Sequence, residues 1–323
     1  MNRLEFKTPG IEEKELMEKY FNTYPTRSCE RTFANVYLWC SYYKVTYAVI
    51  EDTLVFKSEE EEGTAFSFPA GTKENTKRAI ELLIGYCKEK KIAFRMYNVT
   101  REQFEKLDTW YPDQYEIDYK REEADYIYET EKLIHLSGKK LHGKRNHINK
   151  FKEVHQNWSY ETLSEQNKDQ CIEMVYLWEK QNLCSEDEGK SEEVKVTVKA
   201  LNMFQELGLK GGVLKLDGNV IAFTLGEEVK EDTFVIHIEK AFSQIQGAYP
   251  MINQQFASHE CSSYQYINRE EDLGKEGLRK AKLSYRPAFL EEKGMTFYKG
   301  EKEYDIRKNE KDGSGKFSDP CNV

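Results

Sequence analysis

Apolar residues recur along this chain at two spacings, which indicate helices and strands in turn. A spacing of three to four residues predicts helices, and alternation or short apolar runs predict strands. In the first half this pattern predicts two helices, a hairpin with its turn at Glu51-Asp52, a short strand, a third helix and a closing strand. These elements cover Glu12–Phe21, Arg31–Tyr42, Val45–Lys57, Thr64–Phe68, Glu74–Lys90 and Ile92–Tyr97.

The same order of elements returns in the second half. The predicted helices, hairpin, strand, helix and strand cover Gln166–Asn182, Glu192–Leu207, Gly211–Glu227, Thr233–Ala241, Ala248–His259 and Tyr264–Asn268. Between the halves we expect strands and a connector over Tyr111–Thr130, then a helix over Ser137–His155. The repeated order predicts an α/β (α+β) fold of two tandem units, each a mixed sheet flanked by helices. We divide the chain into residues 1–125, residues 126–298 and a charged tail, residues 299–323, predicted to be disordered.

Composition supports two folded units. The chain has 323 residues, and its 39% hydrophobic and 13% aromatic content argues against disorder. No apolar stretch is long enough to span a bilayer, and the N-terminus lacks the apolar core of a secretory signal, so we expect a cytoplasmic protein. The seven cysteines form no C-x-x-C pair, which indicates reduced thiols and predicts no metal site.

Charge is unevenly distributed. The net charge of −9 argues against general nucleic-acid coating, yet no carboxylate occurs between Lys132 and Lys152. We expect this basic segment to contact a local anionic partner. The candidate contacts are Lys139, Lys140, Lys144 and Arg145.

The turn after the predicted strand 233–241 is a candidate phosphate site. Free amides at a helix N-terminus bind anions, and glycine allows a ligand to approach closely. The candidate residues are Gln244, Gln246, Gly247 and Ala248. The alternative is an ordinary strand-to-helix turn that needs glycine for its backbone angles.

The strand itself carries two polar residues, His237 and Glu239, in an apolar run. Either side chain could accept a proton from an attacking amine or hydroxyl. The alternative is a buried His–Glu pair that only satisfies itself.

The tract 266–287 is dense in charge and contains two glycines, which a plain solvated helix would not need. Asn268 and Asp272 could orient a nucleophile, and Tyr285 could protonate a leaving group. Arg279 and Lys282 could bind phosphate or an oxyanion. The alternative is a charged surface loop.

The tract from Tyr266 to Arg279, with Lys282 and Pro287, resembles the signature of the phosphatidylglycerol lysyltransferase C-terminal domain family. The segment 136–151 is similar to the basic helix of that family, and the resemblance extends to about Tyr298. It implies tandem GNAT-like domains, related in fold to Fem-type aminoacyltransferases. It also implies transfer of an aminoacyl group from charged tRNA to a lipid hydroxyl. The chain departs from the family's full-length enzymes because it has no membrane-spanning half and is acidic overall.

The leading hypothesis is therefore an acyltransferase that uses aminoacyl-tRNA, with a lipid hydroxyl or another group as acceptor and no bound cofactor. An anionic lipid head group reached from the inner membrane face is a possible partner. One alternative is a CoA-dependent N-acyltransferase, for which acyl-CoA is the donor. The other is a non-catalytic binding protein that keeps the fold.

Overall fold

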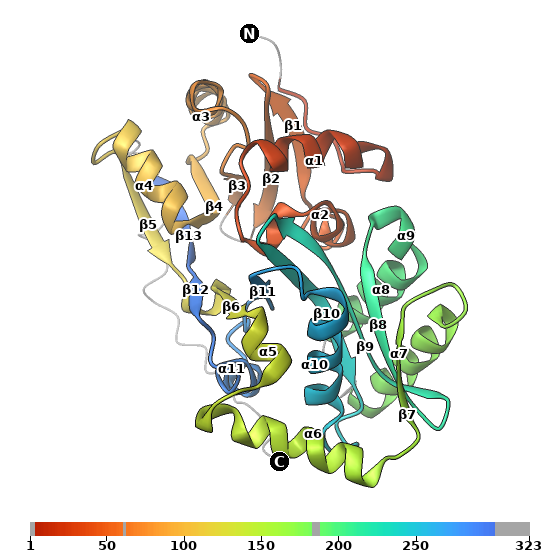
Figure 1. Ribbon diagram of the computed structural model, residues 1–323. Coiled ribbons are helices and arrows are strands. Elements are labelled where there is room, and N and C mark those ends of the chain that lie inside the picture. The colour runs from red at the N-terminus through yellow and green to blue at the C-terminus, as the bar shows by residue number, and fades with distance from the viewer. Residues whose placement is uncertain (1–3, 61–62, 183–187, 301–323) are drawn as a thin grey trace, which may run out of the picture.

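The computed structural model describes residues 4–60, 63–182 and 188–300, which form two mixed sheets flanked by helices (Figure 1). The strand order is β1-β2-β3-β4-β13-β5 in the first sheet and β12-β6-β11-β10-β9-β8-β7 in the second. The strands of the first sheet are β1 (Thr46–Ile50), β2 (Thr53–Glu60), β3 (Gly63–Ser67), β4 (Arg95–Thr100), β5 (Tyr115–Tyr119) and β13 (Lys293–Tyr298). Those of the second are β6 (Asp125–Glu129), β7 (Trp158–Thr162), β8 (Lys210–Leu216), β9 (Asn219–Lys230), β10 (Thr233–Ala241), β11 (Tyr266–Asn268) and β12 (Phe289–Glu291).

The helices surround these sheets on both sides. In the first half they are α1 (Lys14–Thr23), α2 (Phe33–Trp39), α3 (Lys73–Lys90) and α4 (Arg101–Trp110). In the second half they are α5 (Thr130–His135), α6 (His142–Val154), α7 (Lys168–Asn182), α8 (Glu188–Asn202), α9 (Phe204–Leu207), α10 (Ala248–Glu260) and α11 (Glu276–Leu283). Short 3₁₀ turns η1 (Ile11–Glu13), η2 (Cys29–Arg31), η3 (Arg121–Glu123) and η4 (Lys139–Leu141) precede or join them.

A repeated unit lies in both sheets. In the first, the hairpin β1–β2 leads to β3, and the chain returns through α3 to β4, parallel to β3. In the second, the hairpin β8–β9 leads to β10, and the chain returns through α10 to β11, parallel to β10. The predicted fold class, two tandem GNAT-like units of a mixed sheet flanked by helices, is confirmed.

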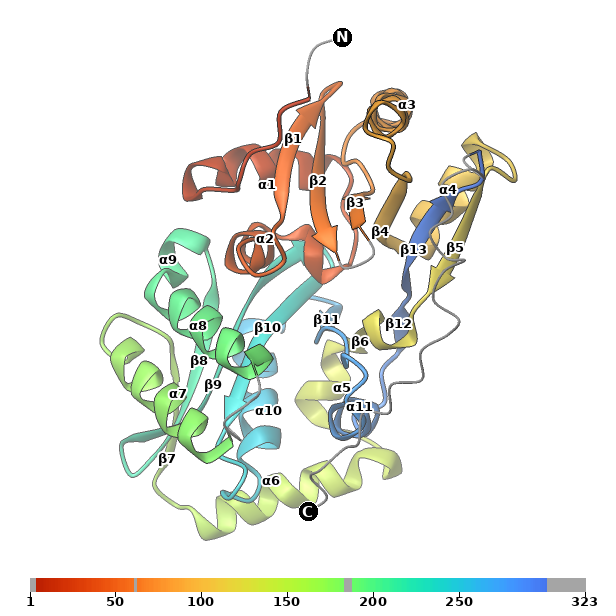
Figure 2. The ribbon, with the colours of Figure 1, turned by 180° about the vertical axis from the view of Figure 1, so that it is seen from behind.

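The last strand of the second half lies in the sheet of the first half. β13 lies between β4 and β5 of the first sheet, although we had assigned residues 126–298 to the second unit. That part of the predicted division needs correction, because the chain crosses back after β12 (Figure 2). Of the predicted disordered tail, residues 301–323 lie outside the described residues.

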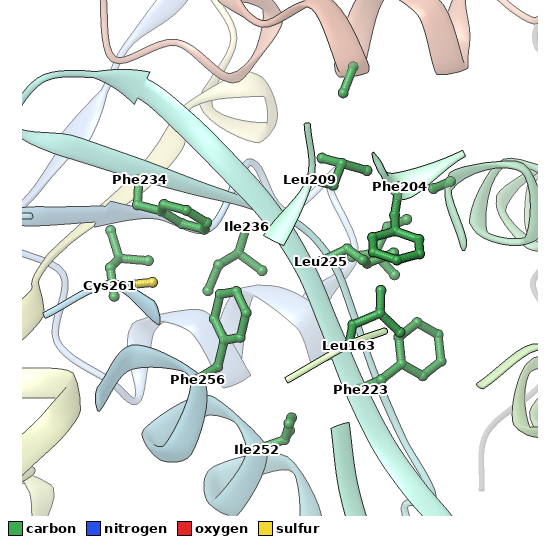
Figure 3. Close-up of a cluster of buried hydrophobic side chains, with 14 of the residues drawn as sticks. Leu163, Phe204, Leu209, Phe223, Leu225, Phe234, Ile236, Ile252, Phe256 and Cys261 are labelled. Carbon is green, nitrogen blue, oxygen red and sulfur yellow. The ribbon is translucent and has the colours of Figure 1, made fainter. Parts of the chain in front are cut away.

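The second sheet is apolar on both faces because helices cover both. Helix α10 packs on β8, β9 and β10 from one side, and α7 packs on β9 from the other (Figures 1 and 2). Phe256 of α10 packs on Phe234 of β10 with ring centres 5.7 Å apart, and Phe223 of β9 lies near Leu163 in the same buried cluster (Figure 3). The same core includes residues of α1 and α2, so it extends across both halves. A second cluster, which includes Phe66, Ile80 and Leu83, lies between α3 and the first sheet. No helix within the described ranges is both long and apolar enough to cross a bilayer.

Candidate active site between strands β10 and β11

The parallel pairing of β10 and β11 is short. It joins Thr233 with Tyr266, Phe234 with Ile267, and Val235 with Asn268. β10 then continues to Ala241 beside β9, with a register shift between Ile236 and Ile238, whereas the chain leaves β11 after Asn268. The two strands therefore separate at one end, and side chains fill the space between them.

An ion pair bridges the separating strands. Nη2 of Arg269 donates to Oε1 of Glu239 at 2.8 Å. Nδ2 of Asn253, on α10, donates to Oε2 of the same carboxylate at 3.1 Å. Asn253 is 1% exposed, and its Oδ1 has no hydrogen-bond partner among the described residues; the same is true of Nη1 of Arg269. A buried donor and a buried acceptor are thus left free beside one carboxylate.

Aromatic rings and a second cation complete this cluster. The guanidinium carbon of Arg269 lies 4.9 Å from the centre of the Tyr285 ring and 5.7 Å from that of Tyr128. Nζ of Lys144, on α6, lies 4.1 Å from the Tyr285 ring. Burial raises the pKa of the Tyr285 hydroxyl, so it keeps its proton at neutral pH. We call the residues Tyr128, Lys144, Glu239, Asn253, Arg269 and Tyr285 the wedge.

The wedge has the groups that acyl transfer requires. Unpaired buried polar atoms cost free energy, and a polar ligand that pairs with them recovers it. The free N–H of Arg269 can stabilise a developing oxyanion, and the carboxylate of Glu239 can accept a proton. Of the residues predicted from sequence, the structure brings Glu239, Tyr285 and Lys144 together here.

His237 does not join them as a base. Its ring nitrogens lie 2.8 Å from Glu270 and 3.0 Å from Glu227, and its side chain is 5% exposed. Burial alone would lower the pKa of His237, but the hydrogen bonds that its ring N–H groups donate to the two carboxylates outweigh burial and raise the pKa to about 10. The prediction of a base near neutral pH is wrong, because the imidazole is already protonated.

The predicted phosphate turn is also wrong. Gly247 has a φ of 91°, and a Cβ there would lie 2.6 Å from the carbonyl oxygen of His147 and 2.9 Å from Cβ of Phe151. The glycine therefore makes room for α6 and not for a ligand. The amide of Ala248 donates to Ile245 within the turn.

The glutamines of this turn are both exposed, and the side chain of Gln244 donates to Gln181. The close packing of Gly247 against α6 agrees with the alternative that the sequence had left open, an ordinary strand-to-helix turn.

Four predicted residues of the 266–287 tract hold the tract itself together. Arg279 binds both oxygens of the fully buried Asp272 at 2.8 Å, and Tyr126 donates to the same carboxylate at 2.6 Å. The hydrogen bonds from Arg279 keep the pKa of Asp272 below its usual range. These roles correct the predicted ones, since Asp272 is fully buried and both of its oxygens accept hydrogen bonds from Arg279.

The side chains of Asn268 and Lys282 also form hydrogen bonds with other parts of the protein. Nδ2 of Asn268 donates to the carbonyl of Arg27 and to Asp125, and the residue is fully buried. Nζ of Lys282 donates to the carbonyls of Arg269 at 2.7 Å and of Glu271. The ammonium of Lys282 therefore fixes the backbone beside the wedge, and the predicted phosphate contact is not supported.

The basic segment divides into surface and structural cations. Lys139 and Lys140 are exposed in η4, directly before α6. Arg145 donates to the carbonyls of Leu136 and Gly138, which closes the end of α5. Lys144 is half-buried in the wedge. Of the four predicted contacts, Lys139 and Lys140 are the two that are exposed to solvent. Contact with an anionic macromolecule requires such exposure.

A second polar cluster joins the two halves. Nζ of Lys293, on β13, lies 2.8 Å from Asp125 and 2.6 Å from Glu30. Cys29, Asp125 and Glu271 could act as metal ligands by their spacing, but this ammonium already supplies the positive charge, so the cluster does not fit an added cation. Burial and nearby carboxylates raise the pKa of Glu271 to about 8, against the opposing charge of Lys293.

Comparison with known proteins assigns the chain to a family. A family model described as "Phosphatidylglycerol lysyltransferase, C-terminal" matches residues 21–296. The chain belongs to this family. Membership in the lysyltransferase C-terminal family supports an acyltransferase-type function, and it confirms the resemblance noted in the sequence.

Solved structures agree with this assignment. A conserved protein of unknown function from Bacteroides thetaiotaomicron is 37% identical with a TM-score of 0.86, over 92% of this chain and 100% of that one. L-PGS from Bacillus licheniformis is 16% identical with a TM-score of 0.63, over 91% and 93% of the two chains, which shows a shared fold. An uncharacterized protein of Mycoplasmoides gallisepticum is 24% identical over 56% of this chain. The aligned region spans 58% of that relative's length.

Sequence reasoning missed three residues of this family member's wedge, which are Tyr128, Arg269 and Asn253. Arg269 was seen only as one cation of a charged tract, and Asn253 lies inside an ordinary helical pattern. The available signal for Arg269 was its position directly after a buried strand. No sequence signal marks Asn253, because its role depends on α10 packing beneath β10.

Proposed function

We propose that this chain transfers an aminoacyl group from aminoacyl-tRNA to a hydroxyl, with a lipid hydroxyl as the acceptor, and that the transfer occurs at the wedge. The family supports acyl transfer in general. The observation that carries the location is the pair of unpaired buried atoms, Nη1 of Arg269 and Oδ1 of Asn253, on either side of Glu239.

The chemistry follows from the wedge residues. The acceptor oxygen attacks the ester carbonyl carbon of the donor while its proton passes to Glu239. The carbonyl oxygen gains negative charge, which the free N–H of Arg269 stabilises. The C–O bond between the acyl carbon and the tRNA oxygen then breaks, and the new C–O bond to the acceptor is kept. The hydroxyl of Tyr285 supplies the proton that the leaving oxygen needs, and the proton on Glu239 returns to Tyr285.

Asn253 orients the substrate in this scheme. Its Oδ1 can accept a hydrogen bond from the donor's amino group, while its Nδ2 holds Glu239 in place. A substrate that pairs with Oδ1 removes an unsatisfied buried acceptor, so its binding is favoured over an analogue lacking the amine.

The larger donor contacts the surface near α6. Lys139 and Lys140 are exposed, and Lys144 of the same basic segment belongs to the wedge. Phosphate contacts by a few lysines give binding that weakens with salt. In an acidic protein, such binding would be confined to this end of the molecule, and a lipid acceptor would be reached from the membrane surface.

A transfer assay tests the proposal. Purified protein would be incubated with a mixture of radiolabelled aminoacyl-tRNAs and phosphatidylglycerol vesicles, and the lipid extract counted and identified by mass. We expect labelled lipid, with the rate falling about 100-fold or more in Glu239→Gln. Glu153→Gln, which changes an exposed carboxylate on α6, serves as the control and should keep the rate.

Parallel reactions with acetyl-CoA as the donor, and a measurement of tRNA binding, distinguish the alternatives. Acylation from acetyl-CoA, with no use of charged tRNA, would show that the donor is wrong while leaving the wedge as the site. Binding of charged tRNA without any product, in wild type as in Glu239→Gln, would indicate a non-catalytic binding protein. Equal activity of wild type and Glu239→Gln would overturn the assignment to the wedge.

A further inference from the structure

Lys144 is unlike the other lysines of the basic segment. Within residues 4–60, 63–182 and 188–300, its Nζ has no hydrogen-bond acceptor and no carboxylate partner in contact. Lys150 by contrast pairs with Glu153 at 3.2 Å on the same helix. Lys139 and Lys140 are exposed to water.

The surroundings of Lys144 disfavour its charged form. The side chain is half-buried, and the guanidinium of Arg269 lies over the same Tyr285 ring. The one nearby carboxylate, Glu239, already has an oxygen bonded to Arg269 and the other to Asn253. Lys144 and Arg269 thus both contact the Tyr285 ring, and Glu239 is the carboxylate near both of them.

The position of Lys144 in α6 also disfavours its charged form. Lys144 lies in the first turn, which contains no acidic residue, and the N-terminus of a helix disfavours positive charge. Contact with the Tyr285 ring favours the ammonium, as does the charge of Glu239. Burial and the charge of Arg269 outweigh them and lower the pKa of Lys144.

We propose that Lys144 is a nucleophilic amine and, within the basic segment, the preferred site of acylation by small activated acyl donors such as acyl phosphates. The lone pair of Nζ attacks the acyl carbon and forms a C–N bond. The C–O bond to phosphate breaks, phosphate leaves with the electron pair, and one Nζ proton passes to water. The lysine becomes an uncharged amide, which removes one of the two cations from the wedge. This reaction needs no turnover of any other substrate, so it is independent of the proposed function.

Competitive labelling tests the proposal. Native protein at pH 7 would be treated with a trace amount of acetyl phosphate, and acetylation at each lysine measured by peptide mass spectrometry. Each unit of pKa lowering gives about tenfold more free amine, partly offset because a less basic amine is a weaker nucleophile. We expect Lys144 to react at least about threefold faster than Lys150, the matched lysine of the same helix.

Two comparisons show whether the structure causes the difference. In urea-unfolded protein the two lysines should react at equal rates. In Arg269→Met the preference for Lys144 should decrease, because the neighbouring cation is gone. Equal rates in the native protein, or a preference that survives unfolding, would overturn the proposal even if Arg269→Met fails to fold.

Discussion

Replacing Lys293 with methionine should strongly destabilise the protein. Lys293 is 1% exposed and lies on β13 in the first sheet, whereas its partner Asp125 is fully buried at the start of β6 in the second. The ammonium also lies 2.6 Å from Glu30 and within 4.0 Å of Glu271. It is therefore the cation that balances several carboxylates at the crossing of the two halves.

The magnitude follows from what remains after the change. Methionine fills a similar volume, so the loss is mainly electrostatic. Asp125 keeps its hydrogen bonds from the Cys29 amide and from Asn268, but it remains a buried charge without a counterion. Removing one partner of a buried ion pair typically costs about 3–5 kcal/mol. We expect a loss of this size in the free energy of unfolding.

Urea denaturation of a double-mutant cycle measures the interaction. The single variants are Lys293→Met and Asp125→Asn, and the third protein carries both. Because Asp125→Asn removes the charge that Lys293→Met leaves unpaired, the double variant should be more stable than the sum of the single losses predicts, by about 2 kcal/mol or more. Strict additivity, or a loss below about 1 kcal/mol in Lys293→Met, would refute this account of the cluster.

Two further predictions concern stability. Gly247→Ala should lower the melting temperature, because its backbone has a φ of 91° and a Cβ there would contact the carbonyl of His147. Gly85→Ala, which adds a Cβ in open space on α3, should raise the melting temperature slightly. Similar shifts in both variants would contradict the packing seen at α6. The pKa of His237 is raised to about 10, so its contribution is fully present below about pH 6.5 and is lost as pH rises towards 10. Urea titrations across this range should show a loss of up to about 1.4 kcal/mol per pH unit that is absent in His237→Gln, and parallel pH profiles would exclude the protonated imidazole.

Much of the fold could be predicted from the sequence because it depends on local patterns. The helix α3 and the hairpin β8–β9 follow directly from apolar spacing and from the turn at Asp217-Gly218. The helix α4 was missed although Thr100 and Gln103 form a capping box at its start. The placement of β13 in the first sheet could not be predicted, since its strand partners are about 180 to 200 residues away.

The candidate site was harder to predict for a physical reason. A charged residue in a sequence carries no sign of whether its partner is protein or ligand. The sequence predicted functional roles for Asp272 and Lys282. In the structure Arg279 pairs with Asp272, and the ammonium of Lys282 donates to backbone carbonyls. Glu239 was named from the sequence as a proton acceptor, and that role stays a prediction. Its partners Arg269 and Asn253 come from different elements, which only the folded chain brings together.

The rate of aminoacyl transfer by Arg269→Lys tests the central claim most directly. Lysine keeps the positive charge but lacks the guanidinium N–H groups that hold Glu239 and reach the oxyanion together. With charged tRNA and phosphatidylglycerol as substrates, the wedge predicts a kcat reduced about 100-fold or more, with nearly unchanged binding of tRNA. A kcat within about threefold of the wild type, in a variant that unfolds at the same urea concentration, would contradict it.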